Sequence, residues 1–179
     1  KIGTTAGEIA FNTGMTGYQE VFTDPSYFGQ ILTMTTAHIG NYGTNKNEVE
    51  SDRTQIAGVV VKKFANNPSR VASDRSLQEM LEQDNVVGIA DVDTRKLVRH
   101  IRDKGAMNAI ISSEITDIKA LQSKMNEVPS MEGLMLSDKV STKEVFSVSS
   151  DGKEELHVAL IDYGVEKNII RCLTERNCK

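Results

Sequence analysis

The 179-residue sequence predicts an α/β fold, and three observations support this prediction. Apolar runs of strand length alternate with stretches in which apolar residues recur at helical spacing. Residues that commonly begin helices precede these stretches, and glycine or asparagine stands near their ends. One run, at 56–61, is apolar without interruption, as in a strand covered on both faces of a sheet. Together these features are typical of layered α/β proteins.

The first third of the chain contains three expected strands. Glu8–Phe11 is a weak strand, and Gln30–Thr35 is apolar and rich in β-branched residues. Ile56–Val61 reads IAGVVV, which predicts a strand buried on both faces of the sheet. The polar segment 44–55 is expected to be a loop.

The first helix is marked at its start by a capping box. Ser76 followed by Glu79 satisfies two backbone N–H groups reciprocally, and Asn85 ends the helix. Val86–Ala90 then predicts another buried strand.

Two further helices follow. Asp93 or Thr94 caps a helix that leaves through Lys104-Gly105, a normal helix exit. Ala109–Ser112 is a short expected strand, and a helix is expected at about Asp117–Asn126.

The last quarter of the chain indicates a second domain. Residues 137–155 are rich in Ser, Thr, Lys, Glu, Asp and Gly, which favours a linker, with Val145–Val148 as an optional surface strand. Leu156–Tyr163 predicts a buried strand, Gly164 a turn, and Glu166–Arg176 a helix. We therefore expect a first domain at 1–136, a linker at 137–155, and at 156–179 the first βα unit of a second domain, cut short at residue 179.

Composition and charge exclude several function classes. A net charge of −4 without a basic run argues against a nucleic-acid partner. The longest apolar runs are far shorter than a membrane span. Two cysteines near the end of the chain form no disulfide framework, which favours the reducing cytoplasm.

Histidines and cysteines offer no obvious catalytic or metal-binding set. His38, His100 and His157 have no partners at metal-ligand spacing, so no metal site is expected. Cys172 and Cys178 lie on or just beyond a helix, whereas a nucleophile elbow places its residue on a sharp strand-to-helix turn. Buried or incidental thiols are the better interpretation.

Two other candidates have simpler structural explanations. Gly164 could belong to a phosphate-binding turn, but one glycine is no dinucleotide fingerprint, and a tight βα turn suffices. Asp91 and Asp93 could act as paired acids, although capping the following helix is sufficient reason for them.

The stretch Phe11–Asn45 contains five of the thirteen glycines and an Asp24-Pro25 turn. Such a concentration of loop-forming residues around one short strand indicates a built surface. Within it, Ser26 offers a hydroxyl and a free backbone N–H at an exposed loop tip. Simple turn chemistry and contact with a ligand are both consistent with this serine.

Long blocks of the sequence resemble the small, glutamine-hydrolysing subunit of carbamoyl phosphate synthetase. The blocks are GEIAFNTGMTGYQEVFTDPSYFGQILTMT (Gly7–Thr35), HIGNYGTN (His38–Asn45), VVGIADVDTRKLVRHIRDKGAMNAII (Val86–Ile111) and VALIDYGVEKNIIRCLTERNCK (Val158–Lys179). The last block is similar to the start of that subunit's class I glutamine amidotransferase domain, with Tyr163 where the family usually has Phe.

This resemblance implies a swivelling β/β/α-type N-terminal domain that contacts a large synthetase subunit. In such proteins a cysteine of the second domain hydrolyses glutamine, and ammonia passes to the large subunit for carbamoyl phosphate synthesis in the pyrimidine and arginine pathways. The resemblance implies no cofactor in this chain, because ATP and its metal ions bind the large subunit.

Carried over residue by residue, the family pattern assigns one site residue. Ser26 matches the serine that contacts bound L-glutamine, and no catalytic residue of the family falls within residues 1–179. Residues 1–179 alone are therefore expected to be inactive. The alternative is a non-catalytic subunit-docking module that makes no ligand contact of its own.

Overall fold

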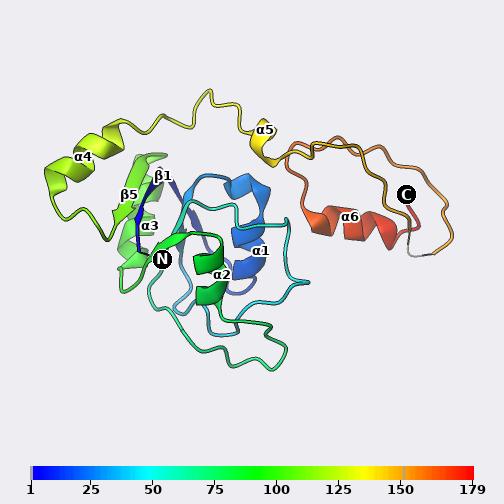
Figure 1. The fold of residues 1–179 in the computed structure, drawn as a ribbon, viewed down its shortest axis with the longest axis horizontal. Helices are drawn as coiled ribbons and strands as arrows, with labels where there is room; N and C mark the ends of the chain where they lie inside the picture. The colour runs from blue at the N-terminus through cyan, green and yellow to red at the C-terminus, as the bar shows by residue number, and fades with distance from the viewer. Residues whose placement is uncertain (1, 151) are drawn as a thin grey trace.

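The computed structural model describes residues 2–150 and 152–179 (Figure 1). Lys1 of the expected first domain and Asp151 of the expected linker lie outside the described residues. Residues 2–126, here called the sheet body, contain every strand that the structure describes. Residues 137–150 and 152–179, here called the C-terminal arm, lie at the opposite end of the molecule from α4 (Figure 1).

From β3 to α4 strands and helices alternate, as expected of an α/β protein. The strands are β1 (Thr4–Asn12), β2 (Ile31–Met34), β3 (Gly58–Val60), β4 (Val87–Ile89) and β5 (Asn108–Ser112). The helices are α1 (Tyr18–Thr23), the single 3-10 turn η1 (Pro25–Tyr27), α2 (Leu77–Gln83), α3 (Thr94–Lys104), α4 (Ile118–Asn126), α5 (Ser137–Val140) and α6 (Lys167–Thr174).

The five described strands form one mixed sheet in the order β4-β3-β2-β1-β5. Neighbours from β1 to β4 are parallel, with Ile9 opposite Ile31 and Ile31 opposite Gly58. Only β5 is antiparallel, and it pairs with the first half of β1. The carboxyl ends of β1 and β2 therefore meet at one edge of the sheet, where loops leave it.

Side chains of the central strands alternate between two cores, one on each face of the sheet. The larger core takes Leu32 and Val59, and α1 and α2 cover it with the buried residues Tyr18, Phe22, Leu77, Met80 and Leu81. The other core takes Ile31 and Val60 and is covered by α3 through Leu97 and Ile101. The sheet body is thus a three-layer arrangement of helix, sheet and helix.

The caps predicted at Ser76 and Asp93 are confirmed, whereas the prediction that Asp91 caps a helix is wrong, because its carboxylate pairs with Lys63. Ser76 and Glu79 form the reciprocal capping box of α2. The Asp93 carboxylate accepts a hydrogen bond from Lys96 N, so Asp93 caps α3, and Gly105 ends that helix with φ of 84°.

The expectation that Val86–Ala90 is a buried strand is wrong in part. β4 pairs with β3 and stands at the edge of the sheet, where Gly88 and Ile89 are exposed. An uninterrupted apolar run is consistent with either a central or an edge strand, and only the strand order decides between them.

The C-terminal arm differs most from expectation. Neither Leu156–Tyr163 nor Val145–Val148 forms a strand, and Ile161 and Tyr163 are about three-quarters exposed (76% and 74%). A buried parallel strand needs a neighbour on each side, whereas here Leu156 makes a single parallel bridge to Cys178. The helix is also shorter than expected, Lys167–Thr174 instead of Glu166–Arg176, and α5 lies inside the expected linker.

Candidate functional site

Ser26 lies in the 3-10 turn η1, directly after α1. The Asp24 carboxylate accepts a hydrogen bond from Ser26 N at 2.8 Å, and Tyr27 N donates to Asp24 O at 3.1 Å. Pro25 fixes φ at the first position of this turn and is buried, while Ser26 is exposed. The turn therefore holds the serine outward on a rigid base.

The Ser26 hydroxyl is exposed as predicted, but the expectation of a free backbone N–H is wrong. Asp24 already takes that N–H, because an aspartate two residues back forms an Asx turn. Within the described part of the chain, no residue makes a hydrogen bond with Ser26 Oγ. Its hydroxyl is the group that this turn leaves available to a ligand.

Residues that follow Ser26 connect the turn to the sheet by hydrogen bonds. Tyr27 Oη accepts a hydrogen bond from Asn12 Nδ2 at 3.0 Å, at the end of β1. Gly29 N then donates to Gln55 O at 3.0 Å, immediately before β2 begins. Ser26 is thus fixed relative to two central strands, although it lies in a loop.

A tyrosine from a later loop caps α1, the helix that leads into the turn. The N-cap residue Gly17 has φ of 78° and no side chain to accept a bond. Tyr42 Oη supplies the acceptor, at 2.8 Å from Gly17 N and 3.1 Å from Tyr18 N. The rings of Tyr18 and Tyr42 stack at 4.1 Å, and burial raises the pKa of both hydroxyls.

The C-terminal arm packs beside the Ser26 turn. A Cβ on Gly164 would lie 3.1 Å from Pro25 Cβ and 2.9 Å from Val140 Cγ2, so a larger residue would crowd this contact. The Gly164 turn is structural, as predicted: Asp162 Oδ1 accepts hydrogen bonds from Gly164 N at 2.7 Å and from Val165 N at 2.8 Å. No phosphate is needed to explain the glycine.

Glu50 joins the sheet body to α6. Its backbone oxygen accepts a hydrogen bond from Lys167 N at 3.0 Å, and its Oε2 accepts one from Asn168 N at 2.8 Å. Arg171 Nη2 lies 3.5 Å from Glu50 Oε1. A buried carboxylate therefore satisfies the first turn of α6, where the helix dipole favours negative charge.

Four carboxylates lie where the arm meets the turn. Burial, together with the charges of Asp24 and Glu50, raises the pKa of Glu166. Burial also opposes ionisation of Asp162, but N–H groups of Val165, Gly164 and Thr142 outweigh it and lower its pKa. The junction beside Ser26 is consequently electronegative, apart from the side chains of Lys167 and Arg171.

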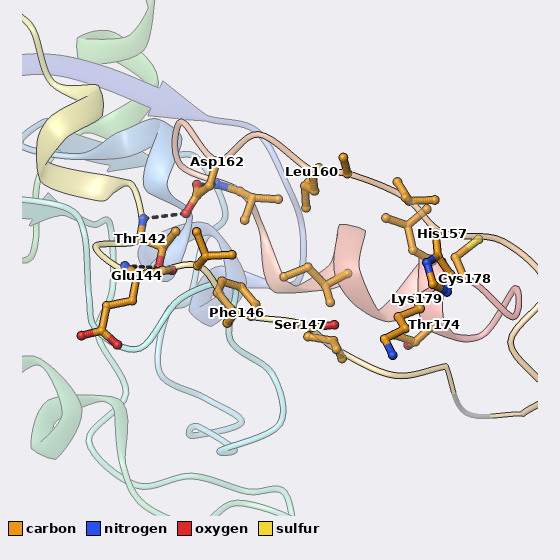
Figure 2. Close-up of a pocket in the computed structure, with 17 residues that line it drawn as sticks. Thr142, Glu144, Phe146, Ser147, His157, Leu160, Asp162, Thr174, Cys178 and Lys179 are labelled. Carbon is orange, nitrogen blue, oxygen red and sulfur yellow. Dashed lines mark hydrogen bonds between the residues drawn. The ribbon is translucent and has the colours of Figure 1, made fainter.

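A hollow of about 590 Å³ in the C-terminal arm does not include Ser26 (Figure 2). It lies between α6 and the two extended segments 142–148 and 157–162, and much of its lining is apolar, including Phe146 and Leu160. Thr142 N donates to Asp162 Oδ2 at 2.7 Å at one end of it (Figure 2). We interpret the hollow as an uncovered apolar face of α6, because the expected strand beside it does not form.

The cysteines are not arranged as nucleophiles. Cys172 lies within α6, and Cys178 is buried just beyond the turn that follows the helix, so neither stands on a strand-to-helix elbow. Cys178 Sγ lies 3.7 Å from Arg176 O, and His157 Nε2 lies 3.8 Å from Glu154 Oε2. Although both residues line the hollow, their polar atoms are directed to these other partners.

Two absences hold for residues 2–150 and 152–179. No group of three or more His, Cys, Asp or Glu side chains is arranged to hold a metal ion. None of the helices in the same ranges is long and apolar enough to cross a membrane.

Asp93 acts as a cap, and Asp91 pairs with Lys63, so the two are not a paired-acid site.

Sequence reasoning missed Glu50 and Asp162. Glu50 is one of several charged residues in a polar loop, and no local pattern distinguishes it from Glu48 or Asp52. For Asp162, a signal was present: an Asp two residues before a glycine favours an Asx turn.

The fold and the site define a class: an α/β protein in which an exposed serine turn of a three-layer body lies beside a packed C-terminal arm. The sequence matches the family described as carbamoyl-phosphate synthase small chain, CPSase domain, over residues 1–111. The chain belongs to this family.

Curated relatives are similar over nearly the whole chain. Carbamoyl phosphate synthase small chains are 44% identical in Synechococcus sp., 45% in Chlorobaculum tepidum and 40% in Vibrio cholerae, each aligned with 99% of this chain. The alignments cover 48%, 48% and 51% of those proteins, so the chain spans about half the length of the curated relatives it matches.

Proposed function

We propose that this chain is the part of a carbamoyl phosphate synthase small subunit that contributes Ser26 to glutamine binding. The complete subunit would hydrolyse L-glutamine and pass ammonia to a large subunit, which makes carbamoyl phosphate from it. Residues 1–136, which include the sheet body, would be the swivelling-type N-terminal domain, with a junction at 137–155 and the start of the amidotransferase domain at 156–179. The assembly would work in the cytoplasm.

The observation that carries this proposal is the exposed hydroxyl of Ser26 on a rigid turn beside the C-terminal arm. The Ser26 N–H donates to Asp24, Pro25 begins the turn, and Tyr27 bonds to Asn12. The Ser26 hydroxyl is therefore the group of this turn that is free to contact a substrate. A hydroxyl can donate one hydrogen bond and accept two, which suits either end of the polar glutamine molecule.

Ser26 would position glutamine, and a cysteine outside residues 1–179 would attack its side-chain amide. Neither Cys172 nor Cys178 has the geometry of an activated nucleophile. We accordingly expect no glutamine hydrolysis by residues 1–179 on their own, and measurable hydrolysis would refute this part of the proposal.

The test is Ser26→Ala in the complete small subunit assembled with its large subunit. Loss of one hydrogen bond should raise the KM for glutamine about 3- to 10-fold. Synthesis from ammonia should be unchanged, because it bypasses the glutamine site. Ser123→Ala, at an exposed position of α4 far from the turn, is the matched control (Figure 1).

An unchanged glutamine KM in Ser26→Ala would contradict the substrate contact. It would favour the alternative, in which the sheet body only docks subunits together and makes no ligand contact.

A further inference from the structure

Helix α3 carries a concentration of positive charge that no part of the proposed glutamine site uses. Five cationic side chains, Arg95, Lys96, Arg99, Arg102 and Lys104, stand against the one carboxylate of Asp103. The helix therefore has a net charge of +4 in a chain whose net charge is −4. Leu97 and Ile101 hold its other side on the sheet.

All three arginines of α3 line one hollow. Arg95, Arg99 and Arg102 are four and three residues apart, so they share one side of the helix. With Val98 and two threonines they line a hollow of about 540 Å³. We call these lining residues the α3 basic face: Thr13, Thr35, Arg95, Val98, Arg99 and Arg102.

The threonines come from the carboxyl ends of two neighbouring parallel strands. Thr13 follows β1 and Thr35 follows β2, and Thr35 N donates to Asn12 O at 3.1 Å, which continues the pairing. Side chains two residues apart on a strand share a face, and Ile9 and Ile31 already face α3. Two hydroxyls thus join three guanidinium groups from a separate element.

The positive charge of the face is hardly compensated within the described residues. Arg102 Nε lies 3.8 Å from Asp103 Oδ1, and no described carboxylate forms an ion pair with Arg95 or Arg99. None of the six lining residues is acidic. Three cations on one face of a helix repel each other, so the hollow favours an occupant that brings negative charge.

The openness of the face selects the kind of anion. All three arginines are exposed, and an isolated small anion gains little from exposed, hydrated cations. Several carboxylates held on one surface engage three guanidinium groups together, at fixed spacing and with one loss of translational freedom. Guanidinium groups also match carboxylates through paired hydrogen bonds.

We propose that the α3 basic face docks an acidic surface of a partner protein. The face lies on the opposite side of the sheet from α1 and α2, so a docked partner leaves the Ser26 turn accessible. The proposal rests on the proposed function only for the partner used in one arm of the test, the large synthase subunit.

The first arm uses the 179-residue chain and a hexaglutamate peptide at low salt, followed by NMR of the arginine Nε–H groups. Arg95, Arg99 and Arg102 should shift, and added salt should reverse the shifts. Inorganic phosphate should shift them only at much higher concentration. An equal response to phosphate would mean a small-anion site, and peptide shifts located elsewhere would also overturn the proposal.

The second arm measures the affinity of the complete small subunit for its large subunit at two salt concentrations. Changing Arg95, Arg99 and Arg102 to Ala should weaken the complex about 10-fold and reduce its salt dependence. Changing all three to Glu should weaken it further. The matched control, Lys119→Glu with Lys124→Glu on α4, should have little effect.

Equal affinities of the wild-type and triple-Ala subunits would overturn the docking proposal. If the wild-type subunit binds no large subunit, the proposed function fails, while the hexaglutamate titration still decides the α3 basic face. The glutamine KM of the triple-Ala variant should equal that of the wild type, which separates docking from the Ser26 contact.

Discussion

The carboxylate of Glu50 accepts a hydrogen bond from the backbone N–H of Asn168 at 2.8 Å, although 118 residues separate them. The Glu50 side chain is only 10% exposed and also lies 3.5 Å from the guanidinium of Arg171. A residue of a polar loop in the sheet body thus serves as the N-terminal acceptor for a helix of the C-terminal arm. This contact fixes the arm beside the turn that carries Ser26.

Replacing Glu50 with Ala should loosen the first turn of α6. A buried hydrogen bond to a charged group stabilises a protein by about 1–3 kcal/mol. Amide exchange at Asn168 should accelerate most, whereas Lys167 N keeps its bond to the Glu50 backbone oxygen. Glu48→Ala is the control, because Glu48 pairs with Arg70 and not with α6. Unchanged protection of Asn168 would contradict this role for Glu50.

Replacing Tyr42 with Phe should destabilise the sheet body by about 1–3 kcal/mol, since two N–H groups at the start of α1 lose their acceptor. The stacked ring remains, so the change isolates the hydroxyl. Urea unfolding measures the effect, with Tyr163→Phe at an exposed position as control. A loss equal to that of the control would show that water caps α1 equally well.

Docking of the C-terminal arm should weaken as the pH rises through the raised pKa of Glu166. Burial and the charges of Asp24 and Glu50 favour the protonated form in the docked state. The docked arm therefore binds more protons than the free arm between the usual pKa of 4.5 and the raised value, and its stability declines across that window.

Glu166→Gln should remove this pH dependence and strengthen docking at pH 7. The gain should not exceed about 1 kcal/mol, because partly exposed charges interact weakly. Protection factors of the α6 amides at pH 5 and pH 7 measure it, and Glu175→Gln at the exposed end of α6 is the control. The same pH dependence in wild type and Glu166→Gln would assign it to another group.

Gly43→Ala should destabilise far more than Gly133→Ala. Both glycines have positive φ, 68° and 80°, so both substitutions carry backbone strain of about 1 kcal/mol. A Cβ at Gly43 would in addition lie 1.9 Å from Ser73 Oγ and 2.8 Å from Arg75 O, whereas none at Gly133 meets an atom within 4 Å. Thermal unfolding of the two variants separates packing from strain. Equal losses of stability in the two variants would show that the loop around Gly43 rearranges to accommodate the added Cβ.

Much of the fold was predictable because its signals are local. The capping box of Ser76 and Glu79, the cap at Asp93 and the exposed turn at Ser26 depend on residues two or three positions apart. The apolar run at 56–61 correctly predicted a buried strand, although β3 itself covers only Gly58–Val60. The role of Ser26 in binding glutamine was predicted from the family resemblance. Its turn alone is consistent both with contact to a ligand and with simple turn chemistry.

Tertiary structure alone decided the features that depend on distant partners. Tyr42 caps α1 from 24 residues away, and Glu50 caps α6 from 118 residues away. Such contacts leave no period or spacing in the sequence, because the two groups meet only when the sheet has formed. For the same reason β4 is an edge strand, and the apolar segment Leu156–Tyr163 remains extended and exposed.

The sequence by itself therefore determined the positions of α2, α3 and α4 and the approximate positions of the five strands, although β1 (Thr4–Asn12) is longer than the weak strand expected at Glu8–Phe11. It did not predict α1 or η1, which lie in the glycine-rich stretch Phe11–Asn45. The tertiary structure decided which strands are covered, which carboxylate docks the C-terminal arm, and that three arginines of α3 meet two threonines of separate strands. The physical reason is range: propensity, capping and hydrophobic period act between near neighbours, whereas strand pairing, burial and electrostatic contact join residues that the chain keeps apart.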